Sequence, residues 1–402
     1  MMKSFKALFL ILLLAASPLS AQKPQLSLIT VSPGNAIYSA FGHTAFRYLD
    51  DENNIDFLYN FGTFDFRDPK FVPKFVQGQL DYFLGVVNFP REFKNYTMLE
   101  NRSVVEQKLN LSQEEIAQIY IFLTKNALPE NRYYKYDFIK DNCSTRIQSV
   151  FENTLGSDIL YDQGTIARIG EKSYREYIRY HLKNNPWFDL GIQLVLGMPL
   201  DQKVLPSDSF FLPALVHDII AGSTLGDGRK LADEDEILFR SEPDPIFDPL
   251  NDPITDPIKF NLPTLLFTVI LALELGLIYI GYIRKKDWAK KSLSCFEYTL
   301  VLLNFLLGLL IFYLWFISDH TATKWNLNIV WCSPLSLTFL ITFFAKGSGQ
   351  KVLRYFSIFM AAMCVLFLLI MAVGIQSACP AVIPILLLYT ILFGRRLFSN
   401  LS

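Results

Sequence analysis

Five apolar stretches in the last third of this 402-residue chain constrain its fold more than any other feature. A helix needs about 20 mainly apolar residues to cross the hydrocarbon core of a bilayer. The first four stretches are near that length, and the fifth is a short or tilted span, or a re-entrant piece. The pattern predicts an α-helical transmembrane bundle of about five spans, at residues 264–283, 296–317, 327–345, 357–374 and 381–394.

The basic residues between these stretches predict how the bundle is oriented. Short loops on the cytoplasmic side of a membrane carry an excess of Lys and Arg. One set of loops holds Lys324 alone, whereas the loops on the opposite side are rich in basic residues. We therefore expect the part before residue 263 to lie outside the cytoplasm and the C-terminus inside, which in a bacterium means the inner membrane. The cytoplasmic set is Arg284, Lys285, Lys286, Lys290, Lys291, Lys346, Lys351, Arg354, Arg395 and Arg396.

The N-terminus reads as an export signal. Lys3 and Lys6 precede an apolar run at residues 7–16, and small residues around Ala21 form a cleavage site. An uncleaved anchor is the alternative, but this apolar run is short for a span. The prediction is a signal peptide at residues 1–21.

Composition divides the rest of the chain. Residues 22–240 are of mixed, globular composition, and residues 241–262 form a Pro- and Asp-rich linker in which prolines at short intervals forbid helix and favour an extended spacer. Residues 263–402 then make up the transmembrane part. Lys+Arg 37 against Asp+Glu 38 excludes a basic nucleic-acid binder, and a mean hydropathy of +0.27 is too high for an ordinary soluble protein.

The globular part has an α+β pattern. Ser112 and Glu115 have the spacing of a capping box at a helix start, and Gly156 has the place of a helix stop. The expected strands are residues 25–31, 44–49, 57–61 and 133–139, and the expected helices are residues 111–123 and 144–155.

Cys143 lies where the last of these strands passes into a helix. The partial positive charge and free N–H groups of a helix N-terminus lower a thiol pKa and stabilise an oxyanion. Cys143 is also the only Cys in residues 22–240. An unpaired Cys in an oxidising compartment favours a reactive thiol, and a buried inert thiol is the alternative.

A thiol nucleophile needs a base within hydrogen-bond reach. His43 follows Gly42 in the strand-rich region, whereas His181 and His217 fall in helical stretches and read as ordinary core or surface histidines. Asn60 on the following strand is a candidate to orient the imidazole, or an ordinary strand-end Asn. No His, Cys and Asp cluster has ligand spacing, so we expect no metal and no cofactor.

These residues resemble a known arrangement. A His on an early strand, a polar residue on the next and Asn-Cys opening a helix about a hundred residues later is the order of circularly permuted papain-like thiol enzymes of the NlpC and lecithin:retinol-acyltransferase type. The amino-acid sequence of the motifs resembles more closely the Lnb family of Bacteroidota, whose members join a periplasmic thiol domain to several C-terminal spans. The matching segments are residues 39–44, 59–66, 136–146 and 319–328.

The resemblance implies lipoprotein N-acyltransfer. Lnb proteins move an acyl chain from a membrane phospholipid to the α-amine of the diacylglyceryl-cysteine of a lipoprotein, so a phospholipid and a diacylated lipoprotein are the expected partners. By position, Cys143 would be the nucleophile, His43 the base and Asn60 the orienting residue. The candidate substrate-binding residues are Asn142, Arg146 and His320.

Two other functions remain open from the sequence. Other NlpC-type domains cut cell-wall peptides with the same Cys and His, which makes a membrane-anchored peptidoglycan amidase or peptidase one alternative. A cell-wall hydrolase must extend from the membrane into the peptidoglycan and often carries a wall-binding module, and we find neither feature in this sequence. A non-enzymatic envelope sensor or assembly factor is the other alternative, and it predicts that Cys143→Ala and His43→Ala leave function intact.

Overall fold

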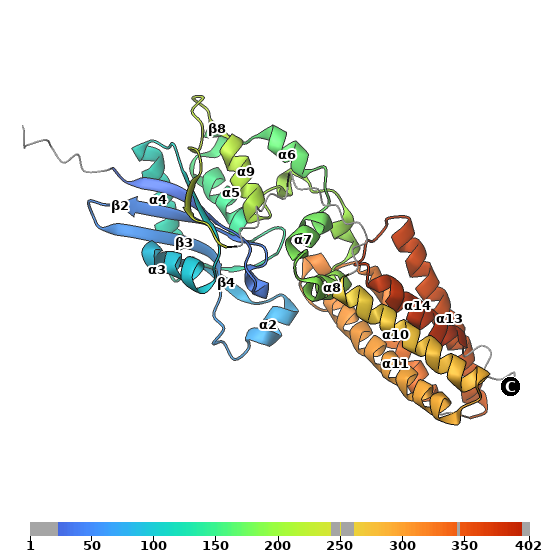
Figure 1. The fold of residues 1–402 in the computed structure, drawn as a ribbon. Coiled ribbons are helices and arrows are strands. Elements are labelled where there is room, and N and C mark those ends of the chain that lie inside the picture. The colour runs from blue at the N-terminus through green and yellow to red at the C-terminus, as the bar shows by residue number, and fades with distance from the viewer. Residues whose placement is uncertain (1–22, 243–249, 251–260, 344–345, 396–402) are drawn as a thin grey trace, which may run out of the picture.

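The computed structural model describes residues 23–242, 250, 261–343 and 346–395. A domain built on a β-sheet and a bundle of helices lie end to end (Figure 1). The predicted signal peptide at residues 1–21 and most of the predicted linker at residues 241–262 lie outside the described residues.

One antiparallel sheet organises the N-terminal domain. Its strands follow the order β6-β4-β3-β2-β1-β5-β9, and each pair of neighbours is antiparallel. A separate two-stranded sheet pairs β7 (Ile159–Leu160) with β8 (Thr224–Leu225). The strands of the large sheet are β1 (Gln25–Val31), β2 (His43–Asp50), β3 (Ile55–Thr63), β4 (Asp81–Asn88), β5 (Val104–Lys108), β6 (Tyr133–Lys135) and β9 (Glu236–Phe239).

Both faces of this sheet are covered, because alternate side chains of a strand point to opposite faces. Leu26 and Leu28 of β1 belong to the core with α4 (Gln113–Asn126), α5 (Cys143–Thr154) and α9 (Pro213–Gly222). Ile29 and Val31 belong to a smaller core on the other face. There α3 (Phe89–Lys94) packs on β3 and β4. The remaining helices of the domain are α2 (Phe71–Gln77), α6 (Gln163–Ile169), α7 (Tyr174–Leu182) and α8 (Pro186–Val195).

Three helices of the C-terminal part are long and apolar enough to cross a membrane: residues 262–283, 287–316 and 348–372. Two further apolar helices, residues 327–342 and 382–395, are shorter. Three of the five predicted spans are therefore confirmed as candidate spans. The helices are α10 (Leu262–Ile278, continued as a π-helix over Tyr279–Ile283), α11 (Asp287–Phe316), α12 (Leu337–Thr342), α13 (Ser348–Ala372) and α14 (Val382–Arg395).

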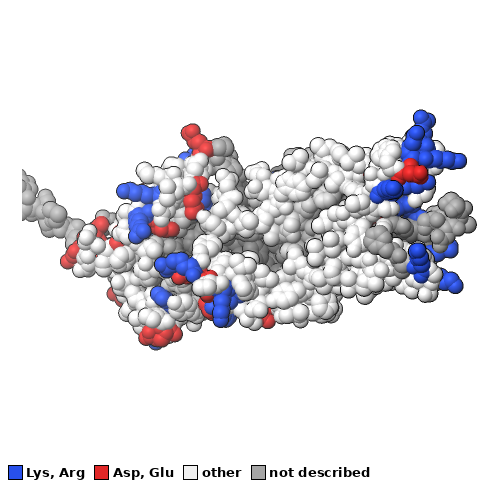
Figure 2. Space-filling view, turned by 90° about the horizontal axis from the view of Figure 1, so that it is seen from below, with Lys and Arg blue, Asp and Glu red and all other residues white. Residues whose placement is uncertain are grey.

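Charge is distributed along the molecule as the loop composition predicts. Figure 2 shows the middle of the bundle free of charged side chains on the visible face, with Lys and Arg gathered at the end far from the sheet domain. An uncharged band between two polar ends is what a bilayer requires of a spanning structure.

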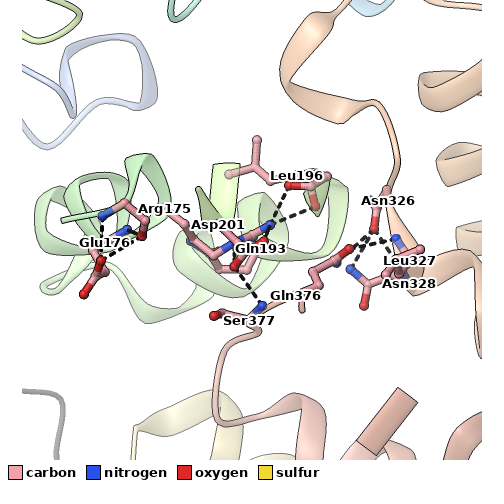
Figure 3. Close-up of polar contacts among 12 residues, drawn as sticks. Arg175, Glu176, Gln193, Leu196, Asp201, Asn326, Leu327, Asn328, Gln376 and Ser377 are labelled. Carbon is pink, nitrogen blue, oxygen red and sulfur yellow. Dashed lines mark hydrogen bonds and ion pairs between the residues drawn. The ribbon is translucent and has the colours of Figure 1, made fainter. Parts of the chain in front are cut away.

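The sheet domain is joined to the outer loops of the bundle by polar contacts (Figure 3). Arg175 of α7 is buried, pairs with Asp201 (2.9 Å) and donates to Gln193 Oε1 (2.7 Å). Asp201 Oδ1 also accepts the backbone N–H of Ser377, between α13 and α14, at 2.8 Å. The same carboxylate thus links the two parts of the molecule.

A second set of contacts joins α8 to the segment after α11. Asn326 and Asn328 both donate to the carbonyl of Leu194 (2.8 and 3.2 Å), and Gln376 accepts the N–H of Leu327 (2.8 Å). Gly197 lies so close to the backbone of Lys324 that a Cβ at this position would be 1.6 Å from the Lys324 carbonyl oxygen. These contacts hold the thiol-bearing domain in one orientation on the bundle.

The local predictions for the domain hold except at one strand. The capping box of Ser112 and Glu115 opens α4, and Gly156 follows α5 with a positive φ of 58°. The strand predicted over residues 133–139 is wrong beyond Lys135. The carboxylate of Asp137 accepts the N–H groups of Ile139 and Lys140 (2.9 and 2.8 Å), which makes a turn instead of a strand.

Candidate active site

Asn142 fixes the start of the helix that carries Cys143. Its Oδ1 accepts the N–H groups of Ser144 and Thr145 (2.8 and 3.1 Å), and its Nδ2 donates to the carbonyls of Phe138 and Phe211 (2.7 and 3.0 Å). The buried amide is therefore fully used within the protein. This geometry makes Asn142 a positioning residue, which holds Cys143 at the first position of α5.

His43 begins β2, and Asn60 lies on the adjacent strand β3. The ring Nε2 and Asn60 Oδ1 are 3.0 Å apart. Because a carbonyl oxygen only accepts, Nε2 carries the proton and Nδ1 keeps its lone pair. Gly42 has a φ of 79°, and a Cβ there would lie 2.9 Å from the carbonyl oxygen of Val31, so glycine is needed immediately before His43.

Cys143 and His43 line one cavity of about 420 Å³. The thiol Sγ lies 3.8 Å from Ser144 Oγ, and in the described part of the chain no hydrogen bond joins it to the His43 ring. Catalytic hydrogen bonds are often long in a free enzyme and shorten when substrate is bound. The sequence-predicted nucleophile, base and orienting residue are thus brought together at one site.

Both reactive groups are neutral in the resting site. Burial lowers the pKa of His43 to about 4; its hydrogen bond to Asn60 opposes this shift, and Arg102 adds to it. Burial also raises the pKa of the Cys143 thiol, although the Ser144 hydroxyl and the backbone N–H of Thr44 act in the opposite direction. These shifts favour a neutral thiol and a neutral imidazole over a preformed ion pair.

The cavity around the thiol is apolar, and its lining contains no Asp, Glu, Lys or Arg. It adjoins a second, mainly apolar cavity of about 370 Å³, which is lined by Leu310 and Leu314 near the outer end of α11 and also by Asp137, Asp319 and His320. An apolar path therefore runs from Cys143 to the bundle. Six residues line both cavities: Phe41, Phe75, Tyr82, Tyr136, Phe138 and Ile192.

The other predicted binding residues lie in two different places. His320 lines the second cavity and donates from Nε2 to the carbonyl of Phe75 at the end of α2 (2.7 Å). Arg146 pairs with Asp141 (2.5 and 2.6 Å) and stacks over the ring of Tyr134, outside the lining of both cavities.

The remaining histidines of the domain are engaged elsewhere. His181 contacts the carbonyl of Tyr177, and His217 contacts Asp218 and Asp235. Neither lines the cavity of Cys143. Among the described residues, no group of three or more His, Cys, Asp or Glu could hold a metal ion.

The aromatic lining is what sequence reasoning missed. Phe64, Phe66, Phe71 and Phe75 come from one short stretch around α2 and form edge and stacked contacts with one another. Four Phe lie between residues 64 and 75, a higher density than the 35 Phe in 402 residues of the whole chain. This local excess is visible in the sequence and could have predicted an aromatic cluster. That these side chains line the cavity of Cys143 depends on the tertiary fold and could not be predicted from the sequence.

Two family models match the chain, one in each part. The Lnb N-terminal periplasmic domain matches residues 16–169, and the Lnb transmembrane domain matches residues 256–400. The chain belongs to the Lnb family. No curated protein and no solved structure matches it.

Family membership fixes the setting of the site. The chain is a membrane protein with a periplasmic domain, as the apolar helices independently indicate. Cys143, His43 and Asn60 lie within the periplasmic match, and His320 lies within the transmembrane match. The predicted domain limits of 22–240 and 263–402 stay predictions.

Proposed function

We propose that this protein is a lipoprotein N-acyltransferase. It moves a fatty acyl chain from a membrane phospholipid, through a thioester on Cys143, to the α-amine of the diacylglyceryl-cysteine of a lipoprotein. The observation that carries the proposal is the apolar path between the thiol and the outer end of α11. The cavity of the thiol has no charged lining side chain, and the adjoining cavity that reaches α11 is mainly apolar. Such a lining suits an acyl chain better than a cell-wall peptide.

In the first half-reaction, His43 Nδ1 takes the thiol proton as Sγ attacks the carbonyl carbon of the phospholipid ester. The bond between that carbon and the glycerol oxygen then breaks. The glycerol oxygen takes the proton from His43 and leaves as the hydroxyl of a lysophospholipid. The acyl group remains on Cys143 as a thioester.

The helix start supplies the oxyanion donor for this step. Asn142 caps the N–H groups of Ser144 and Thr145, and it leaves the N–H of Cys143 without a partner in the described part of the chain. The N–H of Thr44 on β2 also points toward the sulfur. Donors fixed before the reaction stabilise the negative oxygen of the tetrahedral intermediate.

In the second half-reaction, the lipoprotein amine attacks the thioester carbonyl. The C–N bond forms, the C–S bond breaks, and the amine proton passes through His43 to the sulfur. A thioester is exposed to hydrolysis, and the apolar walls of the cavity limit the access of water. We assign His320 to the phospholipid headgroup, because it follows α11 in the chain and lines the same cavity as Leu310 and Leu314 of that helix. Arg146 acts indirectly, through its pair with Asp141 beside the start of α5.

The proposal includes a topology. We place the protein in the inner membrane of a member of the Bacteroidota, with a permuted papain-like periplasmic domain and five spans. The two shorter apolar helices support this: α14 packs against both α10 and α13, and α12 packs against α11 and α13. At 1.5 Å per residue a 14-residue helix spans about 21 Å, so α14 would cross within the bundle and away from full lipid contact.

The test is the intact mass of the purified protein after incubation with phospholipid. Wild type is compared with Cys143→Ser under the same conditions. We expect one acyl chain added to wild type, removable by neutral hydroxylamine as a thioester is, and no such adduct on the variant. If folded wild type in phospholipid vesicles never gains mass and never changes a diacylated lipopeptide, the proposal fails and cell-wall peptides become the substrates to test.

A further inference from the structure

His43 lines two cavities of opposite character. On one side lies the apolar cavity of Cys143, and on the other lies a polar pocket of about 190 Å³. Six residues line both cavities, which therefore adjoin: Tyr38, Gly42, His43, Phe61, Gly62 and Phe64. The polar pocket alone contains charged side chains, namely Glu92, Glu100 and Arg102.

Arg102 of this pocket is buried, with 3% of its surface exposed. Its Nη1 pairs with Glu100 Oε2 (2.6 Å) and its Nε donates to the carbonyl of Ser32 (2.7 Å), which fixes the guanidinium. The guanidinium also lies over the Tyr96 ring (5.5 Å), while its Nη2 is buried and has no hydrogen-bond partner among the described residues. A buried guanidinium N–H is costly to leave unpaired, so its presence in the wall of a pocket points to a ligand oxygen.

The two carboxylates of the pocket have acceptor capacity to spare. Glu92 Oε2 accepts from Asn95, and Glu100 Oε2 accepts from Arg102, while the Oε1 atom of each accepts nothing in the described part of the chain. Two carboxylates against one guanidinium leave the pocket with a net negative formal charge. Such a pocket attracts a cation that carries an oxygen acceptor close by.

We propose that this polar pocket binds the N-terminal aminoacyl group of the acceptor. The α-ammonium lies against Glu92 and Glu100, and the carbonyl oxygen of the same residue accepts from Arg102 Nη2. The inference rests on the proposed function, and it places the amine beside His43, next to the adjoining cavity that holds the thioester. The ammonium gives one proton to water, and the amine proton released on attack passes through His43 to the Cys143 sulfur.

An ethanolamine phospholipid headgroup presents similar chemistry, a primary ammonium near phosphate oxygens. The position of the pocket favours the acceptor, because it adjoins the cavity of Cys143 but shares no lining residue with the cavity at the outer end of α11. A phospholipid that enters beside α11 would have to pass through the cavity of Cys143 before its headgroup reached this pocket.

The two half-reactions separate the possibilities. Wild type, Glu92→Gln and the control Glu114→Gln, an exposed acid on α4, are first loaded from phosphatidylethanolamine or phosphatidylglycerol vesicles, and the thioester is followed by intact mass. A diacylated lipopeptide is then added, and the initial rate of amide formation is measured against its concentration. We expect Glu92→Gln to load at the wild-type rate from both lipids, but to need about tenfold more lipopeptide for half-maximal transfer. Glu92→Asp, which keeps the charge, restores most of the affinity.

An unchanged lipopeptide dependence in Glu92→Gln would overturn the inference. So would slower loading of this variant from phosphatidylethanolamine alone, since that result assigns the pocket to the donor headgroup. Failure of the proposed function itself has a different signature, because wild type would then form no thioester at all. Normal loading of the variant also establishes that it is folded.

Discussion

The periplasmic domain and the bundle bury their charged groups in different ways. Around the domain's site, Arg102 and Glu100 form a buried pair beside a pocket, and one guanidinium nitrogen is left without a partner in the described residues. In the bundle, Glu297 pairs with Arg395 near the end far from the domain, where the basic loops gather as well. The carboxylate of Glu274 in α10 is also buried, and neither of its oxygens has a hydrogen-bond partner among the described residues, but Glu274 lines none of the cavities around Cys143 and His43. The difference lies in what surrounds the unpartnered group: Arg102 lines a pocket beside His43, whereas Glu274 lines none of these cavities. We therefore assign the chemistry to the domain, and to the bundle one wall of the apolar path.

The strongest test of this comparison removes the base from the domain. His43→Ala should slow thioester formation by roughly 10²–10⁴-fold, because no other group that lines the cavity can take the thiol proton. The rate is measured by intact mass over time. His217→Gln is the control, since His217 does not line the cavity, and it should load normally. Equal rates for all three proteins would place the base elsewhere.

Breaking the junction between the two parts should be the next largest effect. Arg175→Met leaves Asp201 buried without its cation, and a broken buried ion pair costs about 3–5 kcal/mol. The free energy of unfolding of the domain, followed by denaturant titration in detergent, should fall by about that amount. Arg67→Met removes an exposed pair with Asp65 and should leave it unchanged. A loss from Arg175→Met no larger than that control would contradict the role of this contact.

Blocking the apolar path between the domain and the bundle should have a smaller effect, and this effect should depend on the length of the donor's acyl chain. Ile192 lines both apolar cavities, so Ile192→Trp should obstruct an acyl chain. We expect loading from long-chain phospholipid to slow by roughly 10²-fold, with little change for a short-chain soluble ester, because the thiol itself is untouched. Ile121→Trp on the exposed face of α4 is the matched control. Equal slowing with both donors would mean that the site is distorted and would not support a path.

The smallest predicted effect is an absence of pH dependence. Only the neutral imidazole accepts the thiol proton, and the pKa of His43 is lowered to about 4. Falling pH therefore protonates His43 only near that value, below the range of an ordinary histidine near 6.5. Thioester formation should stay within about twofold between pH 8 and pH 5.5 and fall as pH approaches 4. A midpoint near 6.5 would show that the imidazole is not desolvated as described.

Local signals explain what could be predicted from the sequence. The helical period of apolar residues over 144–155 predicted α5. The capping box of Ser112 and Glu115 predicted the start of α4, because capping depends on side chains two or three residues away. The strand over residues 133–139 failed at Asp137 for the same kind of reason, since its carboxylate binds the next N–H groups. Such short-range competition is visible in the sequence once Asp is read as a turn former.

The rest depended on contacts between distant segments. Glu92 and Glu100 flank the π-helix Asn95–Leu99, and Arg102 precedes β5, so no motif spacing marks the polar pocket. The meeting of α2 with the segment after α11 joins Phe75 to His320 across 245 positions. The lengths of α11 and α13 were also underestimated, because both begin nine residues before their predicted apolar stretches, within basic segments that favour helix without being apolar.

The most direct test of the central claim follows one acyl chain through Cys143. Wild type is loaded from a phospholipid with an isotope-labelled acyl chain, separated from the lipid and then mixed with a diacylated lipopeptide. We predict that the label leaves the protein and appears as an amide on the α-amine of the lipopeptide, in amounts equal to the thioester lost. If the label stays on Cys143 or is released only as free fatty acid, while the lipopeptide amine remains unmodified, acyl transfer through this thiol is contradicted.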